Sequence, residues 1–277
     1  MKTLSYGYLT GAFLLLSILS GFVVAYQYEP ATPFVSSVAI ETILPFGPFW
    51  RSVHFWTSQA FVMLLMLHVF DLRDRVTQGR APFRLRFHWT VISISVPVGI
   101  YALFSGYVLR YDATGQAAGA IAEHLFLRIP MVGSLVNKVL LNISGDGLNR
   151  IYAVHILAGF VCWLMGTWYH LKRVRITFDA FASAGVFSAF FCFMVKAPID
   201  LAVQNTHLIK GPWFFLGIQE LLRYFDPVLA GIVVPAIPLA VLFLFPWVKK
   251  TRMLYLIILL WTFGYSGVTL ITLLRTG

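Results

Sequence analysis

Seven apolar segments of bilayer length divide this chain of 277 residues and limit it to a membrane fold. With 59% hydrophobic residues, 12% charged residues and a mean hydropathy of +0.79, it lies outside the ordinary soluble class. Because lipid offers the backbone no hydrogen-bond partners, each segment is expected to be helical. The sequence therefore predicts an all-α membrane protein with about seven transmembrane helices. They cover residues 4–26, 53–72, 89–109, 152–171, 180–195 (with a boundary that could extend to 203), 227–248 and 253–274.

Lysine and arginine predict the orientation of the chain. With a cytoplasmic N-terminus, the cytoplasmic segments hold 12 of the 21 Lys and Arg residues and three acids, while the periplasmic segments hold nine and eight. This asymmetry explains the net charge of +10 as positive-inside topology rather than as a nucleic-acid patch. Connections 73–88 and 172–179 are then cytoplasmic, connections 110–151 and 196–226 periplasmic, and the C-terminus lies outside. A cleaved signal peptide is the alternative for the first segment.

Four of the seven histidines form matched pairs within two apolar segments: His54 with His68, and His155 with His170. At a rise of about 1.5 Å per residue, each pair spans roughly 21 to 22 Å of helix, and both rings can face one neighbouring helix. Polar groups inside a bilayer are costly and usually functional. Two such helices predict two haem irons, one above the other. A hydrogen-bonded core histidine is the alternative for each. His88 and His124 fall in predicted connections and His207 in a loop, so for these three we favour an ordinary histidine that binds no metal.

Glycines give an independent indication of haem. Gly7 and Gly21 lie in the first segment and Gly106 near the end of the third. A flat macrocycle beside a helix needs positions without a side chain, although close helix packing is an alternative explanation for any one glycine. Cys162 and Cys192 are expected to be buried thiols. The absence of a C-x-x-C-H motif excludes a c-type haem attached to this chain.

Several short motifs accompany these residues. RSVH places Arg51 three residues before His54, and LNRIYAVH places Arg150 five residues before His155. GYVL covers 106–109 and IPMVGS follows at 129–134. Together with the first segment, GYLTGAFLLLSILSGFVVAYQY, these motifs resemble cytochrome b of the quinol-oxidising cytochrome bc and bf complexes. The resemblance covers essentially the whole chain, as the two bf subunits would appear if joined end to end.

The resemblance implies a four-helix dihaem domain over residues 1–178 and a three-helix domain over 179–277 that completes an outer quinol pocket. It also implies electron transfer between membrane quinol, with menaquinol as our candidate, and periplasmic partners such as a Rieske protein or a multihaem c-type cytochrome. We expect a multi-pass protein of a bacterial or archaeal inner membrane, in contact with lipid and quinone, within a dimeric complex. The expected class is a quinol-cytochrome c oxidoreductase subunit.

The resemblance also assigns haem-binding residues. Two non-covalent b haems are each expected between two histidines, one at His54 and His155 and the other at His68 and His170. Gly7, Gly21 and Gly106 would lie beside the haems, and Arg51 and Arg150 are candidates to bind propionates. Two departures limit the match. A further family glycine position holds Ile92, and a cysteine that binds an extra haem in bf complexes is replaced at about Ser5, so we do not expect that extra haem.

The quinol pocket departs most from the family. The PEWY motif reads Gly211-Pro212-Trp213-Phe214, so its carboxylate and its tyrosine hydroxyl are both absent. Trp213, Phe214 and Phe215 are expected to keep an aromatic wall, with interface anchoring as the alternative. Glu220 and Asp112 are the nearest carboxylates in sequence, and we expect one of them, Glu220 first, to accept the quinol proton. A solvated carboxylate is the alternative for each.

Three other functions remain open from the sequence. A dihaem anchor could relay electrons between quinone and a module without a Rieske protein, and the missing glutamate makes this a realistic alternative. A transporter without redox function would show no haem spectrum. A purely structural subunit would tolerate replacement of all four paired histidines.

Overall fold

The computed structural model describes residues 5–73, 81–170, 177–200, 209, 211–249 and 251–276. The described residues are arranged in helices connected by turns and loops, without strands. The predicted all-α fold is therefore confirmed. The chain forms two compact units, each described by itself below. Unit 1 comprises residues 1–73, 91–106 and 153–201, and unit 2 comprises residues 74–90, 107–152 and 202–277.

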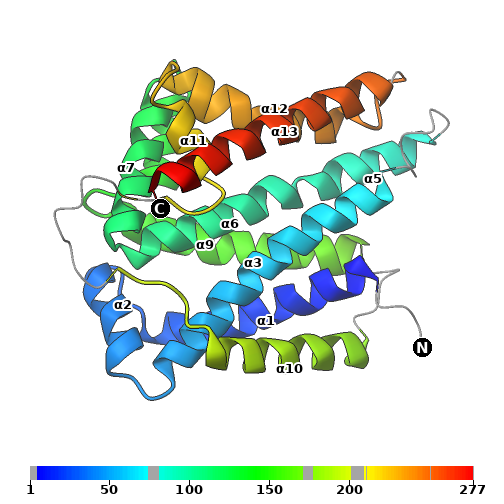
Figure 1. Cartoon of the computed structure of the whole chain (residues 1–277). Helices are drawn as coiled ribbons and strands as arrows, with labels where there is room; N and C mark the ends of the chain where they lie inside the picture. The colour runs from blue at the N-terminus through cyan, green and yellow to red at the C-terminus, as the bar shows by residue number, and fades with distance from the viewer. Residues whose placement is uncertain are drawn as a thin grey trace. The chain divides into compact units, whose positions relative to one another are not determined.

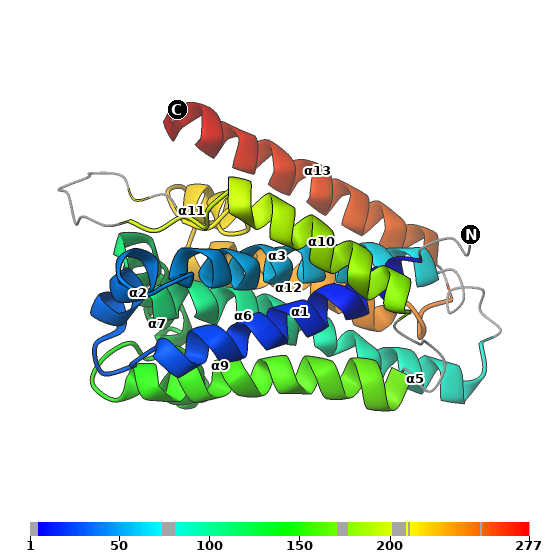
Figure 2. The same ribbon diagram turned by 90° about the horizontal axis from the view of Figure 1, so that it is seen from below.

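Unit 1 is built from long apolar helices. α3 packs along α1, and α10 lies beside both, as Figures 1 and 2 show. α9 and α6 also contribute residues to this unit, and α9 continues into a π-helical segment, η2. The helices are α1 (Tyr6–Gln27), α2 (Pro33–Thr42), α3 (Gly47–Leu72), α6 (Ser95–Arg110), α9 (Gly147–Trp163), η2 (Leu164–His170) and α10 (Phe178–Met194).

Local sequence explains where several of these helices begin. Pro33 and Pro48 lie in the first turns of α2 and α3, where a missing backbone N–H costs nothing. Thr177 caps α10, because its side chain accepts a hydrogen bond from the Ala180 N–H at 3.3 Å. Pro97 explains the break between α5 (Phe83–Ser93) and α6, because proline cannot donate to the carbonyl four residues earlier.

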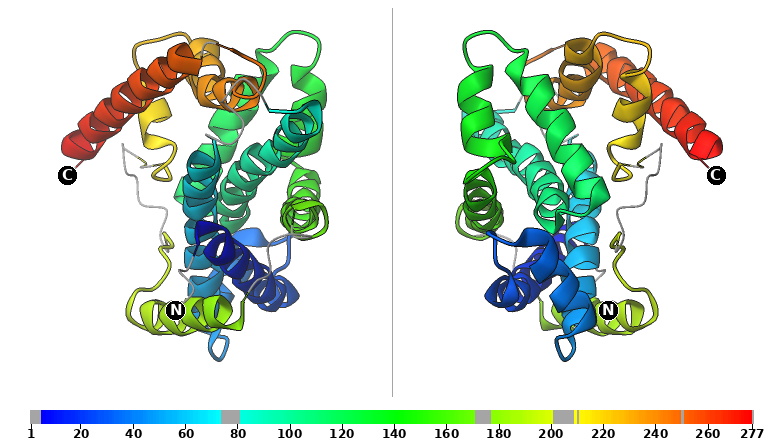
Figure 3. Two further views of the ribbon diagram at one scale, coloured as in Figure 1. Left: turned by 90° about the vertical axis from the view of Figure 1, so that its right-hand side faces the viewer. Right: turned by 90° about the vertical axis from the view of Figure 1, so that its left-hand side faces the viewer.

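Unit 2 combines short helices with one long one. α13 packs against α11 and α12, and Figure 3 shows these three helices together. Trp89 Nε1 donates to the Leu242 carbonyl at 3.0 Å, which joins α5 to α12. The elements are α7 (Ala113–Leu127), α8 (Gly133–Val136), η1 (Asn137–Leu141), α11 (Leu216–Leu221), η3 (Leu229–Val233), α12 (Val234–Leu244) and α13 (Thr251–Thr276).

All seven predicted spans coincide with helices among the described residues. Five are long and apolar enough to cross a membrane: 6–27, 47–72, 83–110, 147–166 and 251–275. The other two, Phe178–Met194 and Leu229–Leu244, are apolar but shorter. The division at residue 178 stays a prediction, and residues 74–80 and 172–176 of connections 73–88 and 172–179 lie outside the described residues.

Candidate haem site

The four paired histidines meet in unit 1 as two facing couples. The ring centroids of His54 and His155 lie 6.2 Å apart, with their planes at 76°. Those of His68 and His170 lie 6.1 Å apart, with their planes at 71°. α3 supplies one ring of each couple, and α9 with η2 supplies the other. The structure thus brings together the same partners that the sequence predicts.

The separation of the rings fits a metal ion between them. Two metal–nitrogen bonds of about 2 Å, with about 1.2 Å from each nitrogen to its ring centre, place two imidazole centroids about 6.4 Å apart. The two couples, at 6.2 and 6.1 Å, are close to that value. Edge-to-face contacts between rings also fall in this range, so the separation fits a metal ion without requiring one. Both couples therefore have room for one iron atom held by two histidines.

Hydrogen bonds orient the rings of the first couple. His54 Nδ1 lies 2.9 Å from the Ser17 carbonyl, which can only accept, so Nδ1 carries the proton. His155 Nδ1 lies 2.9 Å from Ser105 Oγ, and that hydroxyl donates to the Tyr101 carbonyl at 2.8 Å. The Ser105 oxygen is thus free to accept from Nδ1–H of His155. In both rings this leaves the Nε2 lone pair for a metal.

Ser17 and Ser105 are site residues that the sequence does not reveal. Ser17 acts through its backbone carbonyl, which every residue type has. Ser105 directly precedes Gly106, and its side chain is fully buried. Only the tertiary arrangement shows that either residue faces a histidine.

The predicted glycines lie against the histidines. A Cβ added to Gly7 would lie 2.9 Å from His68 Cε1, and one added to Gly21 would lie 2.9 Å from His54 Cε1. At Gly106 the added Cβ would lie 3.3 Å from His155 Cε1. Real side chains essentially never approach as closely as the first two values, so Gly7 and Gly21 leave space that the imidazoles use. This cradle is a second feature that fits a flat cofactor.

The two predicted arginines have protein partners. Arg51 is buried, and its Nε donates to Glu41 Oε2 at 2.7 Å. Its other nitrogens donate to the carbonyls of Ala197 at 2.5 Å and Pro198 at 3.1 Å. Arg150, in unit 2, donates to the Lys138 carbonyl at 3.0 Å. A role for either in binding propionates stays a prediction.

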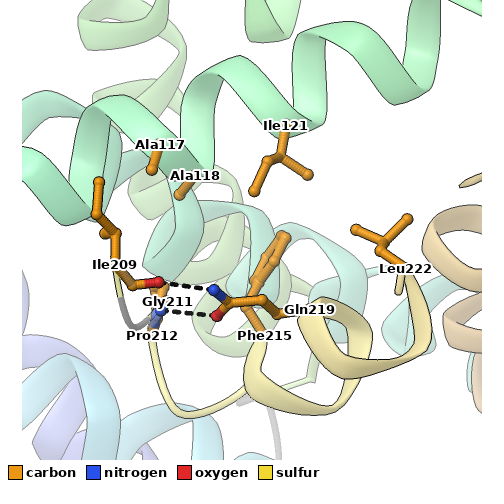
Figure 4. A pocket seen from close by; sticks show the side chains of 9 residues that line it. All are labelled: Ala117, Ala118, Ile121, Ile209, Gly211, Pro212, Phe215, Gln219 and Leu222. Carbon is orange, nitrogen blue, oxygen red and sulfur yellow. Dashed lines mark hydrogen bonds between the residues drawn. The ribbon is translucent and has the colours of Figure 1, made fainter. Parts of the chain in front are cut away.

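A separate small hollow lies within unit 2 (Figure 4). It is bounded by α7, α11 and the segment before α11. Gln219 contributes an amide to an otherwise apolar wall: its Nε2 donates to the Ile209 carbonyl at 2.6 Å, and its Oε1 accepts from the Gly211 N–H at 2.9 Å. The lining residues are Ala117, Ala118, Ile121, Ile209, Gly211, Pro212, Phe215, Gln219 and Leu222.

The three predicted aromatic residues differ in position. Phe215 lines the hollow. Phe214 packs edge-on against Tyr107 at 5.7 Å between ring centroids, and its carbonyl accepts a hydrogen bond from the Tyr265 hydroxyl at 2.7 Å. Trp213 is 43% exposed and contacts Phe214 edge-on. The structure thus places one of the three directly in the wall of the hollow.

Both predicted proton acceptors are buried in ion pairs. Glu220 is 3% exposed and lies 2.6 Å from Arg275 Nη1 and 3.5 Å from Arg223 Nε. Asp112 is fully buried, pairs with Arg110 at 2.7 Å and caps α7 by accepting from the Gly115 N–H at 2.9 Å. Neither carboxylate is among the residues that line the hollow. A proton reaching Glu220 from the hollow would therefore have to pass beyond its lining.

Among the described residues, two further histidines and both cysteines lie outside the two sites above. His88 and His124 lie in helices α5 and α7 rather than in connections, which corrects that part of the sequence interpretation. His207 lies outside the described residues. Cys162 and Cys192 are free and buried, and the Cys162 thiol contacts the Ser95 carbonyl at 3.8 Å.

Comparisons with known proteins identify the family. The model of the cytochrome b/b6/petB family matches residues 1–177. Cytochrome b6 of Cyanidium caldarium is 32% identical over 160 residues, which cover 55% of this chain and 72% of that protein. Cytochrome b6 of Desmonostoc sp. is 31% identical over 171 residues, covering 58% and 76%.

A solved structure extends the likeness beyond the family match. A chain of a structure described as a hyperthermophilic respiratory Complex III has a TM-score of 0.64 and 18% identity, covering 98% of this chain and 85% of that one. This likeness concerns the fold alone. Taken with the family match and the two facing histidine couples, the chain is a haem b-binding membrane protein of electron transport and belongs to the cytochrome b family.

Proposed function

We propose that this chain holds two b haems, one between His54 and His155 and the other between His68 and His170. The observation that carries the proposal is the separation of the ring centroids in the two couples, 6.2 and 6.1 Å, which matches two imidazoles bound to one metal ion. A bis-histidine haem supplies one-electron transfer when bound. His54 and His68 are separated by about 21 Å along α3 from the helix rise, so the two haems would provide two stations for an electron within the bilayer.

Replacement of single histidines tests this ligand assignment. His54→Ala or His170→Ala should remove one of two low-spin b-type signals and about half of the bound haem, because each haem then has one protein ligand. His124→Ala, on α7, is the matched control and should keep both signals. The haem-to-protein ratio and the optical spectrum of the purified protein measure the outcome. Retention of both haems in His54→Ala or in His170→Ala would contradict the assignment.

We further propose that a membrane quinol, with menaquinol as the candidate, binds at the hollow of unit 2, whose walls would have to move apart to admit the head group. An apolar wall with few polar groups is typical of small-molecule sites. A primary amide has two N–H donors and two acceptor lone pairs. Gln219 can therefore hold the backbone at Ile209 and Gly211 and still bind an oxygen of the head group. No residue that lines the hollow carries an ionisable side chain.

Glu220 is our first candidate to accept the proton released by quinol. It directly follows Gln219, and Tyr224 Oη lies 3.4 Å from its Oε1. Arg275 contacts both Glu220 and the Tyr224 hydroxyl and is partly exposed, so this cluster reaches the surface of unit 2. Water would have to connect the hollow to the carboxylate. Asp112 is the second candidate, with a structural role in capping α7 already evident.

The proposed electron acceptors are a periplasmic Rieske protein or a multihaem c-type cytochrome, within a dimeric quinol-cytochrome c oxidoreductase. The alternative is a dihaem anchor that passes electrons between quinone and a module without a Rieske protein. The apolar lining of the hollow favours the alternative, because quinol oxidation needs a proton acceptor within reach. Haem reduction by added quinol, with and without the periplasmic partner, separates the two functions. Bifurcated transfer requires the partner, whereas a simple anchor equilibrates with quinol alone.

We also propose an N-terminus in the cytoplasm and a C-terminus in the periplasm, in a bacterial or archaeal inner membrane. A cysteine introduced at Asn142 or Asn205 should react with an impermeant label in intact cells, and one at Gln78 should not. Gln78 and Asn205 lie outside the described residues. Labelling at Gln78 would invert the orientation.

A further inference from the structure

The two ligand-bearing helices do not have the same spacing between their histidines. His54 and His68 are 14 residues apart on α3, whereas His155 and His170 are 15 residues apart. At about 100° per residue, 14 residues end about 40° short of four full turns and 15 residues end about 60° past them. In two regular α-helices the second ring of one helix would thus differ by about 100° from that of the other. Yet both couples have nearly the same ring separation, 6.2 and 6.1 Å.

The structure contains a local feature that can remove this mismatch. α9 ends at Trp163 and continues as the π-helical segment η2, from Leu164 to His170. In a π turn the hydrogen bond joins residues i and i+5 rather than i and i+4, so one turn of helix holds one more residue. The residues after such a turn therefore keep the direction they would have in an α-helix that is one residue shorter. α3 is regular α-helix over the whole interval from His54 to His68. The extra residue of the fourth span therefore coincides with the π segment.

α1 independently shows that a 14-residue repeat governs the site. Gly21 faces His54 and Gly7 faces His68, and the two glycines are 14 residues apart. α1 and α3 thus share one repeat, which corresponds to about 21 Å of regular helix. The fourth span is the exception, and it is also the one that departs from regular α-helix.

We propose that η2 is a register adaptor that positions His170 opposite His68 by absorbing one residue between the two ligands of the fourth span. The inference rests on the proposed binding of two haems. η2 is a positioning segment, since it acts through His170. It turns a 15-residue interval into the geometric equivalent of a 14-residue one, and so keeps both couples at the same separation.

Single-residue deletions test the adaptor. Gly166 lies within η2 and has no side chain, so its deletion removes no side-chain packing. Deletion of Gly166 should convert η2 to regular helix and keep both b-type signals. Met63 is the matched control: it is 46% exposed in regular α3 between the two histidines. Its deletion should rotate His68 by about 100° and remove one haem.

The readouts are the two optical signals and the haem-to-protein ratio of the purified complex. We expect the Gly166 deletion variant to bind the full amount of haem and the Met63 deletion variant to bind about half of it. In both variants the signal of the His54–His155 haem reports that the bundle has folded. If deletion of Gly166 removes the signal of the His68–His170 haem to the same degree as deletion of Met63, the adaptor proposal is wrong. Retention of both haems in His170→Ala would instead overturn the ligand assignment on which it rests.

A density map of the native complex tests the same point without any deletion, should the shortened protein fail to assemble. The adaptor requires a widened turn with i→i+5 hydrogen bonds between Leu164 and His170 in the haem-loaded protein. A regular i→i+4 ladder through this segment, with His170 still bound to iron, would refute it.

Discussion

The histidine couples of unit 1 and the hollow of unit 2 are built in different ways. In unit 1, the functional side chains come from long helices, with the same repeat on α1 and α3 and a ring separation that varies by 0.1 Å between the couples. In unit 2, the hollow depends on a helix of six residues, α11, and on one amide that holds the preceding segment. Rigid helices preorganise a metal site, whereas a site carried by short elements depends on individual side chains.

The largest effect on the rate of haem reduction is expected for Glu220. It would show how far the hollow of unit 2 depends on a single side chain. If Glu220 accepts the quinol proton, Glu220→Gln should slow quinol-dependent haem reduction by roughly 10²-fold, the usual scale for a lost general base, without changing the haem spectra. Gln219→Leu should instead raise the quinol concentration needed for half-maximal reduction, since it removes the polar group of the hollow. Stopped-flow reduction of the haems measures both effects.

Arg275→Gln provides the control for Glu220, because it breaks the shorter of the two ion pairs of Glu220 while leaving the carboxylate. An equal slowing in both variants would mean that the pair acts structurally. Native rates in both Glu220→Gln and Asp112→Asn would favour the dihaem anchor over a quinol oxidation site.

Glycines beside the histidines should give an intermediate effect. A methyl group at Gly7 or Gly21 collides with an imidazole at 2.9 Å, whereas at Gly106 the contact is 3.3 Å. Overpacking costs about 1–3 kcal/mol, so Gly7→Ala and Gly21→Ala should weaken haem retention about tenfold, and Gly106→Ala less. Haem loss to an excess of apomyoglobin measures the change.

Gly185→Ala is the matched control for the glycine series. It lies in α10, which carries no proposed haem ligand, and an added Cβ there meets nothing within 4 Å. Because alanine favours helix over glycine by about 1 kcal/mol, this variant should retain haem as well as the native protein. Equal haem loss in Gly185→Ala and Gly21→Ala would remove the proposed role of the cradle.

Ser105 should give the smallest effect. Its oxygen can accept from His155 Nδ1–H, which would make the ligand more basic and so stabilise ferric iron. Ser105→Ala should raise the midpoint potential of one haem by about 40 mV, the equivalent of about 1 kcal/mol for one electron. Ser188→Ala removes a buried hydroxyl on α10 and should leave both potentials unchanged. A redox titration with unaltered potentials in Ser105→Ala would show that the hydrogen bond does not tune the haem.

Much of unit 1 could be predicted from the sequence because its signal is periodic. The paired histidines and the glycines of α1 repeat at intervals that helix geometry converts directly into faces and heights. The sequence does not reveal the partners of the rings: Ser17 acts through a carbonyl, and Arg51 binds Glu41 and the backbone after α10. The π segment also escapes prediction, because no residue type encodes it.

Unit 2 was harder to predict because its chemistry depends on local rotation over a few residues. Glu220 and Gln219 are adjacent on α11, so they point in directions about 100° apart. The sequence favours Glu220 because a carboxylate can accept a proton. The structure places the Gln219 amide in the hollow and the Glu220 carboxylate against Arg275. A motif read by position alone cannot distinguish these neighbours.

Electron paramagnetic resonance of the oxidised protein tests the central claim most directly. Two iron sites, each between histidine rings at 76° and 71°, should give two low-spin ferric signals with strong anisotropy, because nearly perpendicular imidazoles leave the iron orbitals almost degenerate. Integration should account for two haems per chain. A single low-spin signal, or a high-spin signal accounting for one haem, would contradict the assignment of two bis-histidine sites.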